Sequence, residues 1–386
     1  MLLFGFLCGV VKRTDARLNS GLRPLSPNDA LAWVRANGLV SHIDSARPEV
    51  VITRYSSLNE SYLIQLPSGD GYFLKSPSSL SRSASIRHEA EIYRLLASTS
   101  ETDRFVPDLV RFDEQRTVLA LKAIPDAVSM DPIAISTRRL ISRSARHLAR
   151  TLTFLHGLSV CQTLPDAPLP PAYGIVLPTR EMHAYMSPAN LALARLVQRD
   201  RVLNDLISRT RDSWDPSTWI HGDLKWPNCL LAMSAERGAG SGVTLVDFEH
   251  SGRGDQHWDL GCIIAAFLGS WVTSISSVTL PRTHTGIPCV PLSLPDVQTA
   301  MRSFWHAYVK DMSLAAELRS SVLEYALNHA ICRMVWSIFE ACTGRDALPE
   351  QAMVTLQLAH NLAARPYEGV RDVLGLASTE TEGRAT

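Results

Sequence analysis

The segment at residues 221–228, with the sequence HGDLKWPN, holds side chains that could carry out chemistry on phosphate groups. Asp223 offers a carboxylate and Asn228 an amide oxygen within this short stretch. Asp247 adds a second carboxylate at the end of the apolar run 243–246. Phosphoryl transfer needs a carboxylate that orients the attacking hydroxyl and accepts its proton, and metal ions that bridge the phosphates. Because Mg²⁺ prefers oxygen ligands, these three side chains predict a metal-dependent site for phosphoryl transfer.

Two short β-rich runs must bring these side chains together. Residues 219–220 precede the segment, and residues 243–246 lead into Asp247. Both runs have the apolar, β-branched or aromatic composition that is typical of strands. We expect them to pair as a hairpin, which would place Asp223, Asn228 and Asp247 in one site.

The wider chain changes character along its length. β-rich runs alternate with turns in the first third, and helical patterns dominate from residue 136 onward. The predicted strands cover residues 50–55, 61–66, 72–75 and 118–124. The predicted helices cover residues 26–38, 86–97, 136–157 and 188–211. The fold class is therefore α+β, with a small β-rich lobe followed by a larger, mainly helical lobe.

Two motifs connect these observations to a known family. Residues 221–228 follow the pattern H-G-D-x-x-x-x-N, and residues 246–260 follow V-D-F-E-x-x-x-x-G-D-x-x-W-D-L. In order and spacing these motifs resemble the aminoglycoside phosphotransferase and choline kinase family, whose members are relatives of the protein kinases. The resemblance extends from about residue 50 to residue 261 and implies a bilobal protein-kinase-like fold.

The resemblance also implies a division of the chain. A nucleotide-binding N-lobe would cover residues 48–122, and a catalytic and acceptor-binding C-lobe would cover residues 123–376. We expect an N-terminal extension with one helix at 1–47 and a disordered tail at 377–386. The apolar start is about half the length of a membrane span, and its basic residues follow it instead of preceding it, so we do not expect a signal peptide.

Roles for the motif residues follow from the same resemblance. Asp223 would be the catalytic carboxylate, and Asn228 and Asp247 would be the magnesium ligands. Asp259 would hold the catalytic segment by hydrogen bonds to its backbone, and His221 would be structural. Glu249 is either a third carboxylate at the metal or, as we favour, an acid that lies beside the metal ligands.

The nucleotide end is predicted from the kinase-like N-lobe. A lysine on the third strand holds the phosphates, and a helix glutamate holds the lysine. Lys75 fits the first role and Glu89 the second, with Glu91 as the competing glutamate. Two further groups of residues are expected to contact ATP or, as the open alternative, GTP: Ser57, Asn59 and Ser61 in the loop over the phosphates, and Leu121 and Ala123 in the linker beside the purine.

The sequence is compatible with two classes of hydroxyl-bearing acceptor, a peptide and a small molecule. Lys225 lies two residues after Asp223, as in the D-L-K-P-E-N segment of Ser/Thr protein kinases, and a cation there could stabilise the transferring phosphoryl group. Together with Trp258 and Trp271, this feature is similar to a subgroup of peptide Ser/Thr kinases from class V lanthipeptide and thioamitide biosynthesis, which act with a lyase partner. The other substrate is a small molecule such as an antibiotic or an amino alcohol, although acidic clusters suited to polycationic antibiotics are few in the C-terminal half. A basic helix at residues 138–150 could meet an acidic peptide or simply face solvent.

Composition excludes other classes of protein. The 386 residues carry no net charge, which argues against nucleic acid as a partner. Beyond the N-terminal run we expect no segment that spans a membrane. Seven scattered cysteines without C-x-x-C spacing favour a reducing cytoplasm over a disulfide framework or a structural zinc site. The competing hypothesis is a pseudokinase, which would bind nucleotide or peptide without turnover.

Overall fold

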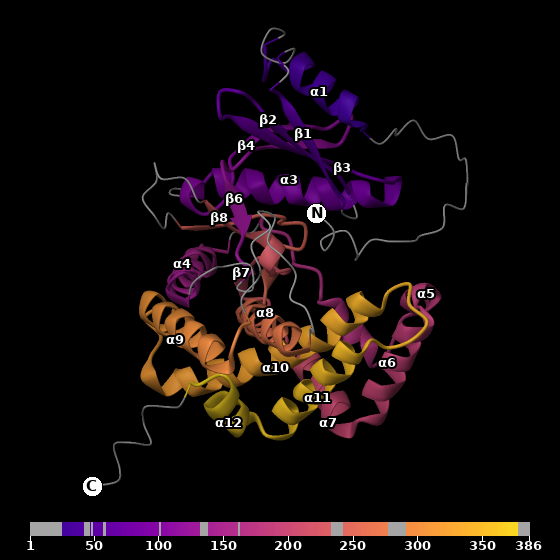
Figure 1. The fold of residues 1–386 in the computed structure, drawn as a ribbon, viewed down its shortest axis with the longest axis vertical. Coiled ribbons are helices and arrows are strands. Elements are labelled where there is room, and N and C mark those ends of the chain that lie inside the picture. The colour runs from indigo at the N-terminus through magenta and orange to yellow at the C-terminus, as the bar shows by residue number, and fades with distance from the viewer. Residues whose placement is uncertain are drawn as a thin grey trace. The chain divides into compact units, whose positions relative to one another are not determined.

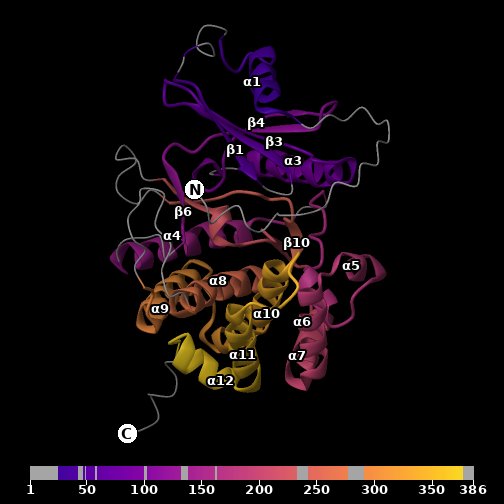
Figure 2. The same ribbon diagram turned by 45° about the vertical axis from the view of Figure 1, so that its right-hand side comes forward.

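The computed structural model describes residues 25–41, 47, 49–56, 59–99, 102–131, 138–160, 163–232, 242–276 and 291–376. The predictions for the apolar start and for the tail at 377–386 lie outside these residues. The chain forms two compact units, which are described separately below (Figures 1 and 2). The smaller unit comprises Leu2–Val128 and Leu230–His250, and the larger unit comprises Ser129–Cys229 and Ser251–Thr386.

This division differs from the predicted one in two respects. The boundary follows Val128 instead of residue 122, and the chain returns to the smaller unit at Leu230–His250, a stretch that was expected in the C-lobe. The return has a clear cause in strand pairing. Strand β9 (Val243–Leu245) joins a small sheet with β6 (Ala127–Ser129) and β8 (Cys229–Ala232), in the order β6-β8-β9, and Leu245 N donates to Phe105 O at 2.8 Å.

A five-stranded antiparallel sheet forms the centre of the smaller unit, in the order β1-β2-β3-β5-β4. The strands are β1 (Val51–Ser56), β2 (Glu60–Gln65), β3 (Gly71–Ser76), β4 (Leu109–Asp113) and β5 (Val118–Lys122). Four of them correspond to predicted strands. The prediction missed β4, whose sequence LVRFD contains two charged residues and whose side chains are all at least partly exposed.

Helices α1 (Pro27–Ala36) and α3 (Ser83–Ala97) cover opposite faces of this sheet (Figure 1). Helix α1 begins as predicted: Ser26 caps it, Pro27 follows, and Ser26 and Asp29 form a reciprocal capping box. Its buried Trp33 packs with Tyr62, Ile64 and other apolar residues of the sheet. Leu74 of β3 belongs to the same cluster. Because side chains alternate across a strand, the next residue, Lys75, faces α3 instead.

The predicted hairpin between residues 219–220 and 243–246 is wrong. Strand β7 (Thr218–Ile220) pairs with β10 (Gly252–Gly254), and β9 lies next to β8 (Cys229–Ala232). Strand β8 is a short apolar run directly after residues 221–228 and was not among the predicted strands. Among the described residues β9 is the next strand after β8, and the two are neighbours in one sheet, so β8 takes the place beside β9 that β7 was expected to take.

Helices build most of the larger unit. The longer ones are α4 (Arg138–Gly157), α6 (Pro188–Arg199), α7 (Arg201–Asp212), α8 (Gln256–Ser276), α9 (Leu294–Asp311), α10 (Ala316–Cys342) and α11 (Glu350–Ala364). Two shorter helices, α5 (Arg180–Tyr185) and α12 (Pro366–Glu368), complete the labelled set (Figure 2). The helical stretch predicted at 188–211 is interrupted at Asp200, whose carboxylate accepts hydrogen bonds from Val202 N and Leu203 N and so caps α7.

Helix α8 lies at the core of this unit. By length and composition it could cross a membrane, contrary to the prediction that no such segment follows the N-terminal run, but 67% of the qualifying window is buried by the rest of the protein. A Cβ at Gly261 would lie 2.6 Å from Ala330 N, so the backbones of α8 and α10 are in close contact there. Four described cysteines are buried free thiols: Cys229, Cys262, Cys332 and Cys342.

Candidate active site

In the smaller unit, Lys75 is the centre of a buried cluster of charges. Its side chain extends from β3 toward α3 and is 7% exposed. The ammonium donates a hydrogen bond to Glu89 Oε2 at 2.6 Å, makes a second, very short contact with Asp247 Oδ1, and lies 3.8 Å from Glu249 Oε2. The competing Glu91 is exposed and pairs with Arg94, so Glu89 is the glutamate that meets the lysine.

Glu249 connects this cluster by hydrogen bonds to Asn59, just before β2, and to the start of α3. Its Oε2 accepts hydrogen bonds from Ser85 Oγ at 2.6 Å, from Arg82 Nη2 at 3.0 Å and from Asn59 Nδ2 at 3.3 Å. Arg82 and Ser85 were not among the predicted site residues. They precede Glu89 within or just before the same helix, but nothing in their types or spacing distinguishes them from surface residues.

The cluster carries more negative than positive charge. Asp247, Glu89 and Glu249 lie within 4.0 Å of Lys75, and Arg82 is the second cation. Burial tends to lower the pKa of Lys75, but these carboxylates raise it above its ordinary value. Burial raises the pKa of Glu89, an effect that Lys75 opposes and that the two other carboxylates increase. A further cation would therefore stabilise this site.

Asp247 has an unusual backbone conformation. Its φ of 70° lies in the left-handed region, which residues other than glycine seldom adopt. Directly after it, Phe248 is buried and packs edge-on against Tyr93 of α3, with ring centroids 5.4 Å apart. Such strain persists only where surrounding packing holds it, and it is common at ligand sites.

The other residues predicted to bind nucleotide occupy varied positions. Ser57 lies outside the described residues. Asn59 and Ser61 are both buried, and Ser61 is opposite Lys75 in the β2–β3 register. Leu121 is buried within β5, and Ala123 N donates to Gly71 O at 3.0 Å. The N–H group of Ala123 is thus already hydrogen-bonded within the smaller unit. A purine could form hydrogen bonds only with other groups of this linker.

In the larger unit, Asp259 holds the segment that follows β7. Its Oδ2 accepts a hydrogen bond from His221 N at 2.7 Å, and its Oδ1 accepts one from Gly222 N at 2.9 Å. The adjacent Trp258 donates from Nε1 to Gly222 O at 2.8 Å. Gly222 has a φ of 82°, a conformation that suits glycine, so the first turn of α8 binds a sharply bent backbone.

Asp259 also belongs to a buried polar network that the sequence analysis missed. The carboxylate is fully buried, and His156 Nε2 lies 3.3 Å from its Oδ2. The other ring nitrogen of His156 is 2.9 Å from Tyr308 Oη on α9. His156 was recognised only as the end of a predicted helix, because its partners are far away in sequence. His221 is buried as well, and its Nδ1 accepts from Asp223 N at 3.3 Å.

Asp223 lies beside two other predicted site residues. Lys225 Nζ donates to Asp223 Oδ2 at 2.6 Å, and Asn228 Nδ2 donates to Asp223 O at 2.9 Å. Asp223 and Lys225 are partly exposed, at 17% and 38% of their side chains, whereas Asn228 is buried. The segment thus exposes part of a carboxylate and of an ammonium to solvent, while the buried Asn228 holds the backbone of Asp223.

These two sets of residues can bind phosphate and accept a proton. Within the described residues, no group of three or more His, Cys, Asp or Glu side chains is arranged to hold a metal ion by itself. This arrangement is compatible with Mg²⁺, because Mg²⁺ is commonly held by only one or two carboxylates together with substrate phosphates. The fold of each unit and the order of these residues along the chain define a kinase-type phosphotransferase.

Comparison with known families identifies the chain further. The phosphotransferase enzyme family (APH) matches residues 51–277, which is more than half of the chain, and the protein belongs to this family. The resemblance stated from the motifs is thereby confirmed at the level of the family. No curated protein sequence matches the chain.

Solved structures confirm the predicted bilobal kinase-like fold class. The choline kinase from Cryptosporidium parvum has a TM-score of 0.53 at 9% identity, with 92% of this chain and 99% of that chain covered. An ADP-bound aminoglycoside phosphotransferase, APH(2'')-Ib, has a TM-score of 0.50 at 13% identity, covering 87% and 98%. A choline/ethanolamine kinase family protein from Mesorhizobium loti has a TM-score of 0.50 at 15% identity, covering 87% and 94%.

Proposed function

We propose that this protein transfers the γ-phosphate of ATP to a hydroxyl group of a small molecule in a Mg²⁺-dependent reaction. The observation that carries the proposal is the buried Lys75–Glu89 pair with Asp247 and Glu249 close to the same ammonium. This cluster holds a lysine for phosphate and a surplus of negative charge for a metal. GTP is the alternative nucleotide.

In the smaller unit, Lys75 would bind the nucleotide phosphates while Glu89 holds its side chain in place. Asp247 would supply a carboxylate oxygen to Mg²⁺, and Asn228 of the larger unit would supply its amide oxygen. Asn228 Nδ2 donates to Asp223, whereas no hydrogen bond among the described residues uses Asn228 Oδ1. The metal, when bound, neutralises charge on the phosphate oxygens.

In the larger unit, Asp223 would orient the acceptor hydroxyl and take its proton. The hydroxyl oxygen forms a bond to the γ-phosphorus, the bond between that phosphorus and the β–γ bridging oxygen breaks, and the nucleoside diphosphate leaves. Lys225, which already contacts Asp223, would stabilise negative charge on the phosphoryl group as it transfers. Asp259 would keep Asp223 in position through the backbone of His221 and Gly222.

The names of the similar structures support a small-molecule acceptor. They describe an aminoglycoside phosphotransferase and two proteins of the choline or ethanolamine kinase type. We therefore place amino alcohols and amino sugars first among candidate acceptors. A cytoplasmic location stays a prediction, which the four buried free thiols suit.

A second candidate acceptor is a Ser or Thr hydroxyl of a peptide. The observation in its favour is the ion pair of 2.6 Å between Lys225 and Asp223, since a lysine at this offset is the feature shared with Ser/Thr protein kinases. If the peptide is a biosynthetic precursor, a lyase partner would then eliminate the phosphate.

One experiment separates these possibilities. The protein is incubated with Mg²⁺, ATP or GTP, and a panel of choline, ethanolamine, aminoglycosides and Ser/Thr peptides, and each acceptor is examined by mass spectrometry for the addition of one phosphate. We expect phosphorylation of a small molecule, and its loss in Asp223→Asn with nucleotide binding retained.

The matched control is Asp205→Asn, which changes an exposed aspartate on α7 of the same unit. Phosphorylation confined to the peptides would establish the second candidate. Nucleotide binding without transfer to any acceptor would favour the pseudokinase. Full activity of Asp223→Asn would refute the assigned role of Asp223.

A further inference from the structure

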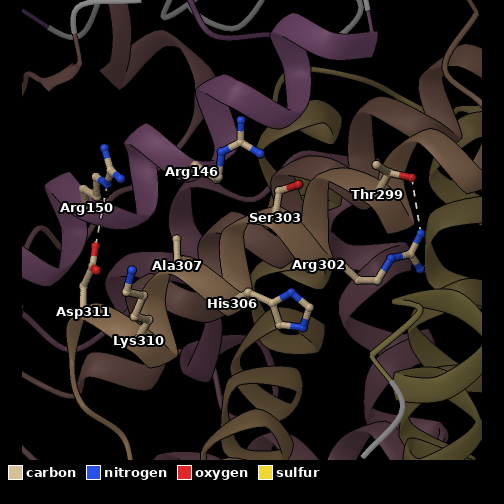
Figure 3. A pocket seen from close by; sticks show the side chains of 9 residues that line it. All are labelled: Arg146, Arg150, Thr299, Arg302, Ser303, His306, Ala307, Lys310 and Asp311. Carbon is tan, nitrogen blue, oxygen red and sulfur yellow. Dashed lines mark hydrogen bonds and ion pairs between the residues drawn. The ribbon is translucent and has the colours of Figure 1, made fainter. Parts of the chain in front are cut away.

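A basic hollow lies in the larger unit, on the surface of α4 and α9. Its volume is about 450 Å³, and Figure 3 shows its walls. Arg146 and Arg150 come from α4, and Arg302, His306 and Lys310 come from α9. The two helices pack against each other through apolar residues, and the cations are on the outer side of this contact.

The hollow has a strong surplus of positive charge in a chain with no net charge. Four permanently charged cations line it, against the single carboxylate of Asp311, which lies 3.9 Å from Arg150. Among the described residues, no carboxylate forms an ion pair with Arg146, Arg302 or Lys310. Burial lowers the pKa of the neighbouring His147, and three arginines of α4 lower it further. Surface cations so close together repel one another, and an anionic partner would relieve that repulsion.

The basic side chains have a regular spacing along the helices. Arg302, His306 and Lys310 follow one another at intervals of four residues and form a row along α9 (Figure 3). Arg146 and Arg150 have the same interval on α4. Four residues of an α-helix rise by about 6 Å. In an extended peptide, side chains on the same side are two residues apart, which is about 6.6 Å.

We propose that this hollow binds an acidic segment of another polypeptide in an extended conformation, with Asp or Glu at alternate positions. Each carboxylate would meet one turn of the row of basic side chains on α9, and the arginines of α4 would flank the bound segment. A single inorganic anion would leave most of these cations unused. Nucleic acid would need a broader basic surface than five side chains provide. The proposal goes beyond phosphoryl transfer and does not depend on the identity of the acceptor.

The test uses a fluorescent peptide, EGEGEGE, and anisotropy measurements with the full chain. We expect binding that weakens with added salt, because the contacts are exposed charge pairs. Arg146→Glu combined with Lys310→Glu should reduce affinity at least tenfold. The control variant combines Arg195→Glu with Arg199→Glu on α6, which are exposed and change the total charge by the same amount. It should alter affinity less than twofold.

Two comparison ligands test the spacing and the class of partner. The peptide EEEEGGG has the same charge in a block, and it should bind at least threefold more weakly than EGEGEGE. Inorganic phosphate and a single-stranded oligonucleotide should compete only weakly. Equal loss of affinity in both double variants, equal binding of the two peptides, or strong competition by phosphate or the oligonucleotide would each overturn the proposal. Thermal unfolding of all variants verifies that they are folded.

Discussion

Asp259 offers the sharpest test of how the catalytic segment is positioned. Its two carboxylate oxygens each accept a backbone hydrogen bond, from His221 N at 2.7 Å and Gly222 N at 2.9 Å, in a fully buried environment. In Asp259→Asn, the amide oxygen can accept only one of these bonds, and the NH₂ group faces the other backbone N–H. One donor is then buried without an acceptor.

The size of the effect follows from these contacts. A hydrogen bond to a charged group contributes about 1.5–3 kcal/mol, and a neutral one about 1 kcal/mol. The substitution removes one charged bond and weakens the other, so we expect the free energy of unfolding to fall by about 2–4 kcal/mol. Urea unfolding of the wild type, of Asp259→Asn and of the control Asp205→Asn measures this change without knowledge of the acceptor.

A kinetic measurement distinguishes positioning from stability alone. Displacement of Asp223 by about 1 Å should reduce kcat roughly 100-fold. The KM for nucleotide should change less than about threefold, because Lys75, the residue proposed to bind the nucleotide phosphates, belongs to the smaller unit. If the variant loses stability but keeps its kcat, Asp259 does not position Asp223. If its stability stays within about 0.5 kcal/mol of the wild type, the hydrogen-bond argument itself is refuted.

Three further predictions concern other residues of the two units. Lys75→Met should weaken nucleotide binding at least tenfold in calorimetry, whereas the exposed Arg111→Met on β4 of the same sheet should leave it unchanged; equal binding in both would exclude Lys75 from the phosphate site. Lys225→Ala should lower kcat by about 100-fold with little effect on the KM for nucleotide, and an unchanged kcat would mean that this lysine is only a solvated surface residue. Burial lowers the pKa of His329, although Asp255 opposes this, so the unfolded chain binds the proton more readily. The free energy of unfolding should therefore fall as pH decreases below about 6.5, by at most about 1.4 kcal/mol per pH unit for this group, and His329→Gln should reduce that slope in urea titrations from pH 7.5 to 5.

Local signals in the sequence were sufficient for much of the fold. Helix α1 was predictable because Ser26, Pro27 and Gly38 mark its ends by local chemistry alone. The strands that carry Lys75 and Ser61 were predictable from their alternating, β-rich composition. Strand β4 was missed because it carries charged residues, and strand β8 was not recognised although its four residues are mostly apolar.

The partners of the site residues were harder to predict, because they depend on packing over long distances along the chain. Glu89 was preferred to Glu91 by family resemblance, and the structure shows the physical reason: Glu89 is on the buried face of α3. The hydrogen bonds that join Asp259 to His156, and His156 to Tyr308, link helices that no local pattern connects. Similarly, the basic hollow needed α4 and α9 to be neighbours.

The buried cysteines make local opening of this protein measurable without an attached probe. Burial raises the pKa of Cys229, of Cys262 and of Cys332, the last to about 12, so these thiols are inert while they stay enclosed. Cys229 directly follows Asn228, and Cys262 is one turn of α8 beyond Asp259. The rate at which each thiol reacts with an added disulfide therefore reports how often its own surroundings open. Added nucleotide could slow one reaction and leave the other unchanged, and the two rates would then show which part of the larger unit responds to the ligand.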